Sequence, residues 1–469
     1  MPRIAIIGGG ISGLSAAFTL EEKRRGGAPV EYVLFESSPR LGGVMVTDRV
    51  DGCLVEAGPD SFLTEKPWAA NLCRKIGLGG QLIGSNDSER KTYIVVKNRL
   101  VVMPDGLMFM VPTKIMPIVF SPLFSLRTKI RMAAEWFHPP RKASADETVA
   151  AMVERHYGRE MVDRLADPLL SGVYGGEASE LSVRAALARF AEMEAKYGSL
   201  GRAMLAARKK MAGVNRPAPP LFTSLKDGMQ QMVDALAAHL DSSALRTSAP
   251  VQSVVADEDG WSVSSGSQIA HFDALIVATP APAASRLLQL ADENLARELR
   301  EIRYSSSVTV ALGYDETVRR SLPPGFGFLV PRSEGRRMLA ATFVHNKFPH
   351  RAPENRALVR CFFGGAHAEE ILDRSENQIL EILRDELRQI IGLNAEPLFA
   401  RVYKWKSAMA QYSVGHLDRL QRIESLRRKL PRLALAGNGY SGIGVPDCVR
   451  SGSEAAGKIL AEMGMPPAA

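Results

Sequence analysis

Three glycines near the start of the chain have the spacing of a phosphate-binding turn. Gly8, Gly10 and Gly13 follow the apolar run at residues 3–7 and precede a predicted helix. In such a turn the second glycine lets the backbone approach a pyrophosphate, and the third lets the helix pack closely on the strand. The N-terminus of that helix then faces the phosphate charge. The residues predicted to line this loop are Gly8, Gly9, Gly10, Ile11, Ser12 and Gly13.

A carboxylate at the end of the next predicted strand strengthens the prediction of a nucleotide site. Residues 30–36 end in Glu36, with Ser37 beside it, and the carboxylate can accept hydrogen bonds from the hydroxyls of an adenosine ribose. The same acid would repel a 2′-phosphate, which argues against NADP. The alternative is a glycine turn without a ligand, but two strands, a helix and a terminal acid together are far more specific than glycines alone.

The chain contains a single nucleotide-binding unit of this kind. A second match to the glycine pattern, at residues 437–442, is followed by too little chain for another unit with its own acid. A separate nicotinamide site therefore has no place. This favours a dinucleotide that stays bound, and FAD fits that description better than NAD.

Other reactive residue types show no catalytic or metal-binding spacing. The four cysteines are far apart and form no C-x-x-C pair. Together with the absence of a basic, apolar leader, this predicts a reducing, cytosolic compartment. His345, His350 and His367 fit neither a zinc-finger nor an H-E-x-x-H pattern and are expected at the surface. No metal is predicted, so the chemistry depends on the cofactor.

Three further motifs resemble those of the amine-oxidase-like flavoprotein superfamily. They are S-S-P-R-L-G-G-V at 37–44, V-E-A-G-P-D-S-F at 55–62 and L-A-G-N-G-Y-S-G-I-G-V-P-D-C-V-R-S-G at 435–452. The resemblance implies that they line the pyrophosphate and the isoalloxazine of FAD. The chain departs from the superfamily at Met409-Ala410, where a proline commonly precedes the glutamine. The implied contacts are Arg40, Gly42, Gly43, Val44, Gly58, Pro59, Asp60, Ser61, Val251, Trp405, Gly437, Gly444 and Val445.

Within that superfamily the chain is similar to protoporphyrinogen oxidases and their coproporphyrinogen-oxidising relatives. The similarity rests on D-P-L-L-S-G-V-Y-G-G at 167–176, Y-S-S-S-V-T-V at 304–310, G-F-G-F-L-V-P at 325–331 and Q-Y-S-V-G-H at 411–416. It implies an FAD-dependent oxidase of haem biosynthesis that converts protoporphyrinogen IX to protoporphyrin IX. Hydride would pass to flavin N5, and O2 would reoxidise the flavin.

Several alternatives stay open at this point. Coproporphyrinogen III could be the substrate instead, because the two porphyrinogens differ in vinyl versus propionate groups and a sequence does not count the charges of a pocket. A flavin amine oxidase or desaturase on the same fold would need an aromatic cage or a long apolar tunnel. A non-catalytic escort protein of this fold would have lost the flavin, which the intact glycines and Glu36 disfavour.

The resemblance also implies a substrate slot beside the flavin. Arg90 is the candidate for holding a propionate, because a guanidinium can bind a carboxylate through two hydrogen bonds. Leu329 and Phe362 would sandwich a pyrrole near Thr342, and the carbonyl of Gly176 would lie near the reacting macrocycle. The alternatives are a solvated surface arginine, ordinary core packing and a turn glycine.

The predicted fold is α/β: a Rossmann-like FAD-binding domain with an inserted mixed-sheet substrate domain and an inserted helical, membrane-facing domain. With 469 residues the chain is long enough for two or three domains. The FAD-binding domain is predicted at 1–84, 225–280 and 408–469. The substrate domain is predicted at 85–106, 200–224 and 281–407, the helical domain at 107–199, and a linker at 213–221.

One segment of the helical domain has the composition of a membrane-surface element. Residues 107–132 mix Met, Phe and Ile with Lys and Arg around three prolines. Such a segment could lie among lipid headgroups or could be a core segment broken by prolines. No apolar run is long enough to span a bilayer, and the net charge of +8 is spread along the chain. The expected partners are the porphyrinogen and O2; peripheral contact with a membrane and a homodimer are left open, and nucleic acid is not expected.

Overall fold

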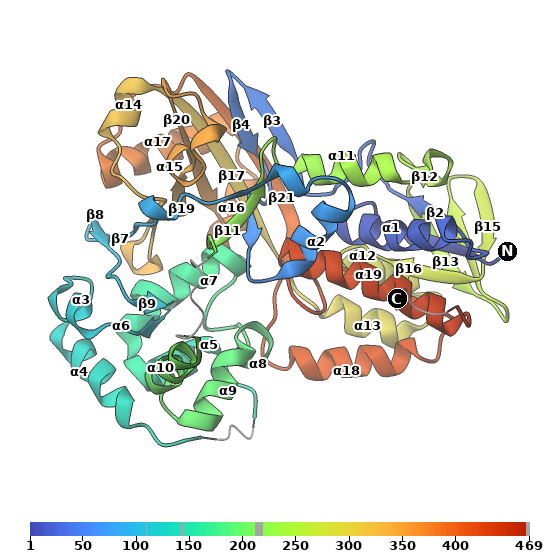
Figure 1. The fold of residues 1–469 in the computed structure, drawn as a ribbon, viewed down its shortest axis with the longest axis horizontal. Helices are drawn as coiled ribbons and strands as arrows, with labels where there is room; N and C mark the ends of the chain where they lie inside the picture. Colours follow the sequence, from blue (N-terminus) through green and yellow to red (C-terminus); the bar gives the residue numbers. More distant parts are fainter. Residues whose placement is uncertain (109, 142–144, 212–218, 466–469) are drawn as a thin grey trace.

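The N-terminal glycine motif lies on a five-stranded parallel sheet (Figure 1). The structure is a computed structural model and describes residues 1–108, 110–141, 145–211 and 219–465. The sheet order is β12-β2-β1-β16-β22, so the chain reverses direction across the sheet between β1 and β16. Open parallel sheets bind ligands beyond the carboxyl ends of their strands at such a reversal. The strands are β12 (Leu245–Arg246), β2 (Glu31–Phe35), β1 (Arg3–Ile7), β16 (Ala274–Val277) and β22 (Leu433–Leu435).

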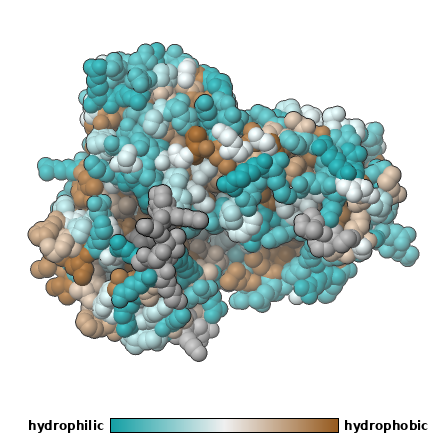
Figure 2. Space-filling model, viewed as in Figure 1, coloured by the Kyte–Doolittle hydropathy of each residue, from teal (hydrophilic) through white to brown (hydrophobic). Residues whose placement is uncertain are grey.

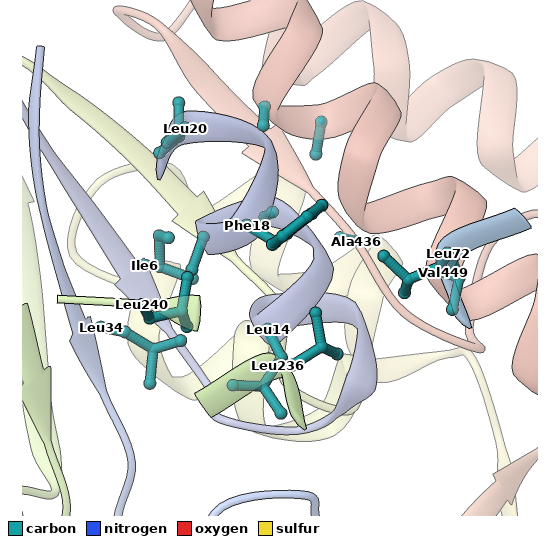
Figure 3. Packing of buried hydrophobic residues seen from close by; sticks show 14 of the residues in the cluster. Ile6, Leu14, Phe18, Leu20, Leu34, Leu72, Leu236, Leu240, Ala436 and Val449 are labelled. Carbon is teal, nitrogen blue, oxygen red and sulfur yellow. The ribbon is translucent and has the colours of Figure 1, made fainter. Parts of the chain in front are cut away.

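Both faces of this sheet are covered. On one face, Ile4 and Ile6 pack with helices α1 (Ile11–Arg25), α2 (Pro67–Lys75), α11 (Gln230–His239) and α19 (Val445–Glu462). Figure 3 shows Leu14 of α1 beside Leu236 of α11 within this core. The other face carries a three-stranded antiparallel sheet and three helices. These are β13 (Val251–Ala256), β14 (Trp261–Ser265), β15 (Gln268–Phe272), α12 (Ala281–Leu288), α13 (Glu293–Arg300) and α18 (His416–Arg427).

A mixed seven-stranded sheet forms a second layer, in the order β21-β17-β20-β19-β18-β7-β8. One of its faces packs against α17 to form a separate core, and α14 and α16 also lie against the sheet. The strands are β21 (Phe399–Ala410), β17 (Tyr304–Asp315), β20 (Arg356–Phe363), β19 (Met338–Phe343), β18 (Gly327–Leu329), β7 (Thr92–Val96) and β8 (Arg99–Val102). The helices around it are α14 (Glu316–Ser321), α15 (Val344–Lys347), α16 (Ala368–Leu372) and α17 (Glu376–Ile391).

The helices between residues 115 and 211 pack together around a third hydrophobic core. They are α3 (Ile115–Phe120), α4 (Leu126–Ala134), α5 (Val149–Tyr157), α6 (Arg159–Met161), α7 (Asp167–Tyr174), α8 (Val183–Ala186), α9 (Ala188–Tyr197) and α10 (Leu200–Met211). Short strands join the parts: β3 (Thr47–Val50), β4 (Cys53–Glu56), β5 (Phe62–Leu63), β6 (Leu82–Gly84), β9 (Leu107–Met108), β10 (Val111–Pro112) and β11 (Phe222–Leu225). No helix among the described residues is long and apolar enough to cross a membrane.

The predicted α/β architecture with insertions is observed, but the packing differs from two predicted boundaries. Helices α12 and α13 pack on the parallel sheet, although the sequence predicts residues 281–300 to be part of the substrate domain. Helix α10 packs among the other helices, because Leu200, Ala203 and Met204 belong to their core. The apolar stripe of an amphipathic helix looks the same whichever core the helix packs against. The sequence therefore does not show which core each of these helices joins. Most of the predicted linker at 213–221 lies outside the described residues.

Candidate active site

The phosphate-binding turn forms where β1 meets α1. Gly10 is the N-cap of α1, and its backbone lies beside Gly42 in an isolated bridge. The carboxylate of Glu36 accepts hydrogen bonds from the backbone N–H of Gly9 at 2.7 Å and of Ser38 at 2.8 Å. These bonds fix the acid at the edge of the turn, because β1 and β2 are adjacent in the sheet. The predicted glycine turn and acid are thus brought together at the carboxyl ends of two neighbouring strands.

Two of the glycines have contrasting surroundings that define where a ligand fits. A Cβ atom on Gly13 would lie 1.9 Å from the carbonyl oxygen of Gly8, so Gly13 permits the close approach of helix and strand. A Cβ on Gly10 would meet no atom within 4 Å, because this residue faces open space at the helix N-terminus. Open space, free backbone N–H groups and the positive end of the helix dipole suit a pyrophosphate.

A second segment completes this cradle from the C-terminal end of the chain. Gly444 is the N-cap of α19, and its backbone N–H donates to the carboxylate of Asp447 at 3.3 Å. A Cβ on Gly437 would have only the carbonyl oxygen of Thr279 nearby, at 3.8 Å. The Thr279 hydroxyl follows β16 and has no hydrogen-bond partner among the described residues, although it is buried. An unpartnered hydroxyl at the reversal of the sheet fits a polar ligand there.

The residues predicted for the adenosine and phosphate ends lie around Glu36 and Gly10. The backbone N–H of Ala249, two residues before Val251, donates to the carbonyl of Glu36 at 2.9 Å. The Ser37 hydroxyl donates to the Glu36 carboxylate at 3.2 Å. The exposed Arg40 side chain donates to the carbonyl of Gly43 at 2.6 Å, so the guanidinium braces the loop that touches Gly10.

The loop at residues 58–61, predicted to line the isoalloxazine, lies between the parallel sheet and the seven-stranded sheet. A Cβ on Gly58 would lie 1.9 Å from the carbonyl oxygen of Val44, so two predicted flavin segments are in close contact. On the other side, the indole N–H of Trp405 in β21 donates to the carbonyl of Ala57 at 2.9 Å. The Asp60 carboxylate accepts a hydrogen bond from the Ser61 hydroxyl at 2.6 Å. This loop, the predicted flavin loop, is thus held by Val44 on one side and by β21 on the other.

Charged residues that the sequence analysis missed anchor this loop. The ammonium of Lys347 lies 2.9 Å from the Asp60 carboxylate, and the buried Arg351 pairs with the buried Glu56. Arg360 in β20 donates to the carbonyl of Gly58. Burial alone would raise the pKa of the Asp60 carboxyl, but the charges of Lys347 and Arg360 hold that pKa well below its usual range. Asp60 therefore stays ionised.

Three predicted substrate residues share one face of the seven-stranded sheet. Thr342 lies opposite Arg360, while Phe362 and Leu329 both lie opposite Ala340. Residues directly opposite each other in antiparallel strands project to the same face. This face is distinct from the one packed on α17, whose core contains Phe328, Phe343 and Cys361 instead. Leu329, Thr342 and Phe362 are partly exposed, and the face they share also carries the arginine that contacts the flavin loop.

Helix α7 lies against these strands and brings Gly176 toward them. A Cβ on Gly172 would lie 3.8 Å from a methyl group of Leu329. Gly176 is buried just beyond the helix, and its carbonyl accepts a hydrogen bond from the Ser171 hydroxyl at 3.1 Å. A Cβ on Gly176 would lie 1.7 Å from the side-chain oxygen of Gln411, so a larger residue there would have to displace the glutamine side chain.

Arg90 lies at the sheet edge beyond the slot residues. It is exposed and ends the short turn at Asp87–Glu89, two residues before β7 begins at Thr92. Thr92 is paired with Gly327, which in turn lies opposite Thr342. No described residue forms an ion pair with Arg90, so its guanidinium is available to an anionic group.

The predicted surface location holds for two of the three histidines. His350 and His367 are exposed as expected, but His345 is only 2% exposed, so its predicted surface location is wrong. Its Nδ1 lies 3.2 Å from the Leu358 carbonyl oxygen across the α15–β20 contact, and burial lowers its pKa to about 4. It is a neutral core residue. The described residues contain no group of three His, Cys, Asp or Glu side chains able to hold a metal.

Comparisons with known proteins identify the family of this chain. Residues 11–460 match the family described as flavin-containing amine oxidoreductases. A coproporphyrinogen III oxidase of Bacillus subtilis (strain 168) is 33% identical over 462 residues, which cover 97% of each chain. Protoporphyrinogen oxidase 2 of Arabidopsis thaliana is 27% identical, and the match covers 98% of this chain and 94% of the plant protein.

Solved structures show the same architecture. A structure from Exiguobacterium sp. 255-15, provisionally assigned as a protoporphyrinogen oxidase, superimposes with a TM-score of 0.88 at 28% identity and covers 99% of both chains. Cyclohexylamine oxidase from Brevibacterium oxydans IH-35A, at 17% identity, has the same fold with a TM-score of 0.70 over 99% of both chains. The predicted flavin cofactor and the resemblance to flavoprotein oxidases are confirmed. The chain belongs to the family of flavin-containing amine oxidoreductases.

Proposed function

We propose that the protein is an FAD-dependent porphyrinogen oxidase. The observation that supports this most strongly is that the predicted slot residues share a sheet face with Arg360, which binds the predicted flavin loop at Gly58. A flat, partly apolar face beside the flavin suits a macrocycle. When bound, FAD supplies a two-electron acceptor for hydride, and O2 is the proposed final acceptor.

The residues of the chain would bind and orient the substrate. Leu329 and Phe362 offer apolar contacts for a pyrrole ring, and Thr342 offers a hydroxyl between them. The carbonyl of Gly176 would face positive charge that develops on the macrocycle as hydride leaves. Arg90 would hold a propionate at the open edge. Mixing the purified protein anaerobically with a porphyrinogen tests the proposal: bleaching of the flavin absorbance is expected, and an unchanged spectrum with either porphyrinogen would contradict it.

Two porphyrinogens are candidates for the substrate. Protoporphyrinogen IX is the first expectation from the sequence, with coproporphyrinogen III as the alternative. Three relatives named coproporphyrinogen III oxidase, from Bacillus subtilis, Propionibacterium freudenreichii and Mycobacterium tuberculosis, are 33%, 30% and 31% identical, and a fourth, from Staphylococcus aureus, is 28% identical. The plant protoporphyrinogen oxidases are 27% to 29% identical. These identities favour coproporphyrinogen III as the first substrate to test.

Replacing Arg90 with alanine is expected to raise KM for the porphyrinogen about ten- to hundredfold, because charge-assisted hydrogen bonds contribute about 1.5–3 kcal/mol each. The flavin content should not change, since Arg90 lies at the far edge of the slot. Steady-state kinetics measure the effect. Arg90→Lys keeps the charge but loses the paired hydrogen bonds, so its KM should lie between those of the unmodified protein and of Arg90→Ala. Unchanged kinetics in Arg90→Ala would remove Arg90 from the site.

We also propose that α3 and α4 attach the protein to a membrane surface. Large apolar side chains project there into solvent, including Ile115 at 76%, Phe120 at 77% and Leu126 at 73% exposure. Figure 2 shows the apolar patch over these helices at the lower left. Exposed cations such as Arg127 and Arg131 lie on α4 beside it. Apolar and cationic side chains together suit the boundary between acyl chains and anionic headgroups.

Flotation with vesicles of phosphatidylglycerol and phosphatidylcholine tests the attachment. The unmodified protein should float, and the double variant Ile115→Asp/Phe120→Asp should stay at the bottom of the gradient, because two exposed apolar side chains proposed to enter the bilayer are replaced by anions. Ile269→Asp is a matched control, since Ile269 is 75% exposed on β15, at the opposite end of the molecule. Unmodified protein that stays at the bottom would rule out the proposed attachment.

A further inference from the structure

Five charged side chains meet where the seven-stranded sheet contacts the flavin loop. Lys347, Arg351 and Arg360 are cations, while Glu56 and Asp60 are anions. Two pairs account for four of them: the Lys347 ammonium lies 2.9 Å from Asp60, and Arg351 binds Glu56. Both partners in each pair are largely shielded from solvent. One positive charge, that of Arg360, is therefore left without a carboxylate of its own.

The surroundings of Arg360 do not neutralise it in another way. Its side chain is 5% exposed, and its closest carboxylate oxygen, on Asp60, is 3.9 Å away and already bonded to Lys347. One terminal nitrogen donates to the carbonyl of Gly58, whereas Nε has no partner among the described residues. The guanidinium also lies 5.0 Å from the ring centroid of Phe362. Arginine stays protonated in proteins, so Arg360 is a buried cation that shares the Asp60 carboxylate with Lys347, and the five side chains carry one excess positive charge.

An excess positive charge that is buried lowers the stability of the folded state, so its presence indicates an anionic counterpart in the loaded protein. Two counterparts are conceivable: a flavin ring, which gains one negative charge on accepting a hydride, or a carboxylate of the substrate. The position favours the ring. Arg360 is bonded to the flavin loop at Gly58, and its guanidinium lies over the ring of Phe362 on the same sheet face. The side chain is only 5% exposed, which leaves little surface for a carboxylate.

We infer that Arg360 supplies a fixed positive charge that favours the reduced, anionic flavin over the oxidised one. The inference rests on the proposed flavin site but not on the identity of the substrate. Arg360 acts on the flavin through space and through the loop at Gly58, so it is a positioning residue for the cofactor. A preorganised cation at the point where negative charge develops lowers the free energy of the charged state without any reorganisation.

The reduction potential of the bound flavin tests this role in the purified holoprotein, by equilibration with a reference dye and no porphyrinogen. Arg360→Met should shift the equilibrium between oxidised and reduced flavin at least tenfold toward the oxidised form, which is about 30 mV for a two-electron couple. Arg360→Lys, which keeps the charge, should retain most of the original potential. Arg356→Met is the matched control, because Arg356 lies on the same strand but pairs with Asp51 at the exposed end.

Each outcome decides the inference. An unchanged potential in Arg360→Met with normal flavin content would overturn it, and so would a raised KM for porphyrinogen without a change in potential, which would assign Arg360 to the substrate. If Arg360→Met loses the flavin, Arg360→Gln provides a neutral side chain that can still donate to Gly58. Loss of flavin from both neutral variants but not from Arg360→Lys would support a role for the charge. Loss from all three would show that Arg360 only anchors the loop.

Discussion

Replacing Gly10 with alanine is expected to abolish flavin binding while the apoprotein stays folded. The backbone of Gly10 has φ −70° and ψ 178°, which alanine adopts readily, and the added Cβ would meet no protein atom within 4 Å. Alanine at a helix N-cap lowers the free energy of unfolding by about 1 kcal/mol. The same methyl group would occupy the space left for the pyrophosphate. Losing two charge-assisted hydrogen bonds there would weaken binding by about 3–6 kcal/mol, or about a hundred- to ten-thousandfold.

Two measurements separate lost flavin binding from lost stability. The flavin absorbance of the purified variant reports binding, and the urea midpoint of its apoprotein reports stability. Gly457→Ala is the matched control: this glycine lies inside α19 and a Cβ on it would also meet no atom, so the variant should keep its flavin. A Gly10→Ala protein that keeps a full complement of flavin would show that the pyrophosphate does not approach this residue.

Replacing Arg351 with methionine is expected to lower the free energy of unfolding by about 3–5 kcal/mol, the usual cost of removing one partner from a buried ion pair. Arg351 is 1% and Glu56 4% exposed, so no water can replace the lost guanidinium. Arg351 also donates to the Ser224 hydroxyl at 2.7 Å and thereby joins the turn between α15 and β20 to β11. Urea unfolding of the holoprotein measures the change.

The double variant Arg351→Met/Glu56→Gln distinguishes an unpaired charge from lost packing. It should recover much of the stability, because the glutamine no longer leaves a buried anion and can still accept from the Met229 N–H. Arg320→Met removes an exposed pair with Glu316 and should change the free energy of unfolding by less than about 1 kcal/mol. Equal losses in Arg351→Met and the double variant would contradict the electrostatic explanation.

The nucleotide end of the site could be predicted from the sequence because its parts are close together in the chain. Gly9 and Glu36 are 27 residues apart and meet through two adjacent parallel strands, a geometry that a strand-helix-strand unit dictates. The slot residues needed the family resemblance, since Leu329, Thr342 and Phe362 read as ordinary strand residues in isolation. Alternation in β20 could have placed Arg360 on the same face as Phe362, two positions away.

Other features depended on contacts between distant segments. Lys347 and Asp60 are 287 residues apart in the chain, and nothing in the sequence around either residue predicts that they form an ion pair. His345 is buried because α15 packs on β20, although histidine is usually only partly buried. The segment at 107–132 is ambiguous in the sequence, since apolar residues broken by prolines suit either a protein core or a membrane surface. The exposed side chains of α3 and α4 favour the surface.

Turnover of the two porphyrinogens under air tests the central claim most directly. The purified holoprotein would be offered coproporphyrinogen III and protoporphyrinogen IX separately, with porphyrin fluorescence and hydrogen peroxide followed together and Gly10→Ala as the flavin-free control. Oxidation of at least one substrate is predicted, with about one peroxide formed for each pair of electrons removed and no enzymatic rate in the control. A flavin-loaded protein that oxidises neither porphyrinogen above the rate in buffer would contradict the account.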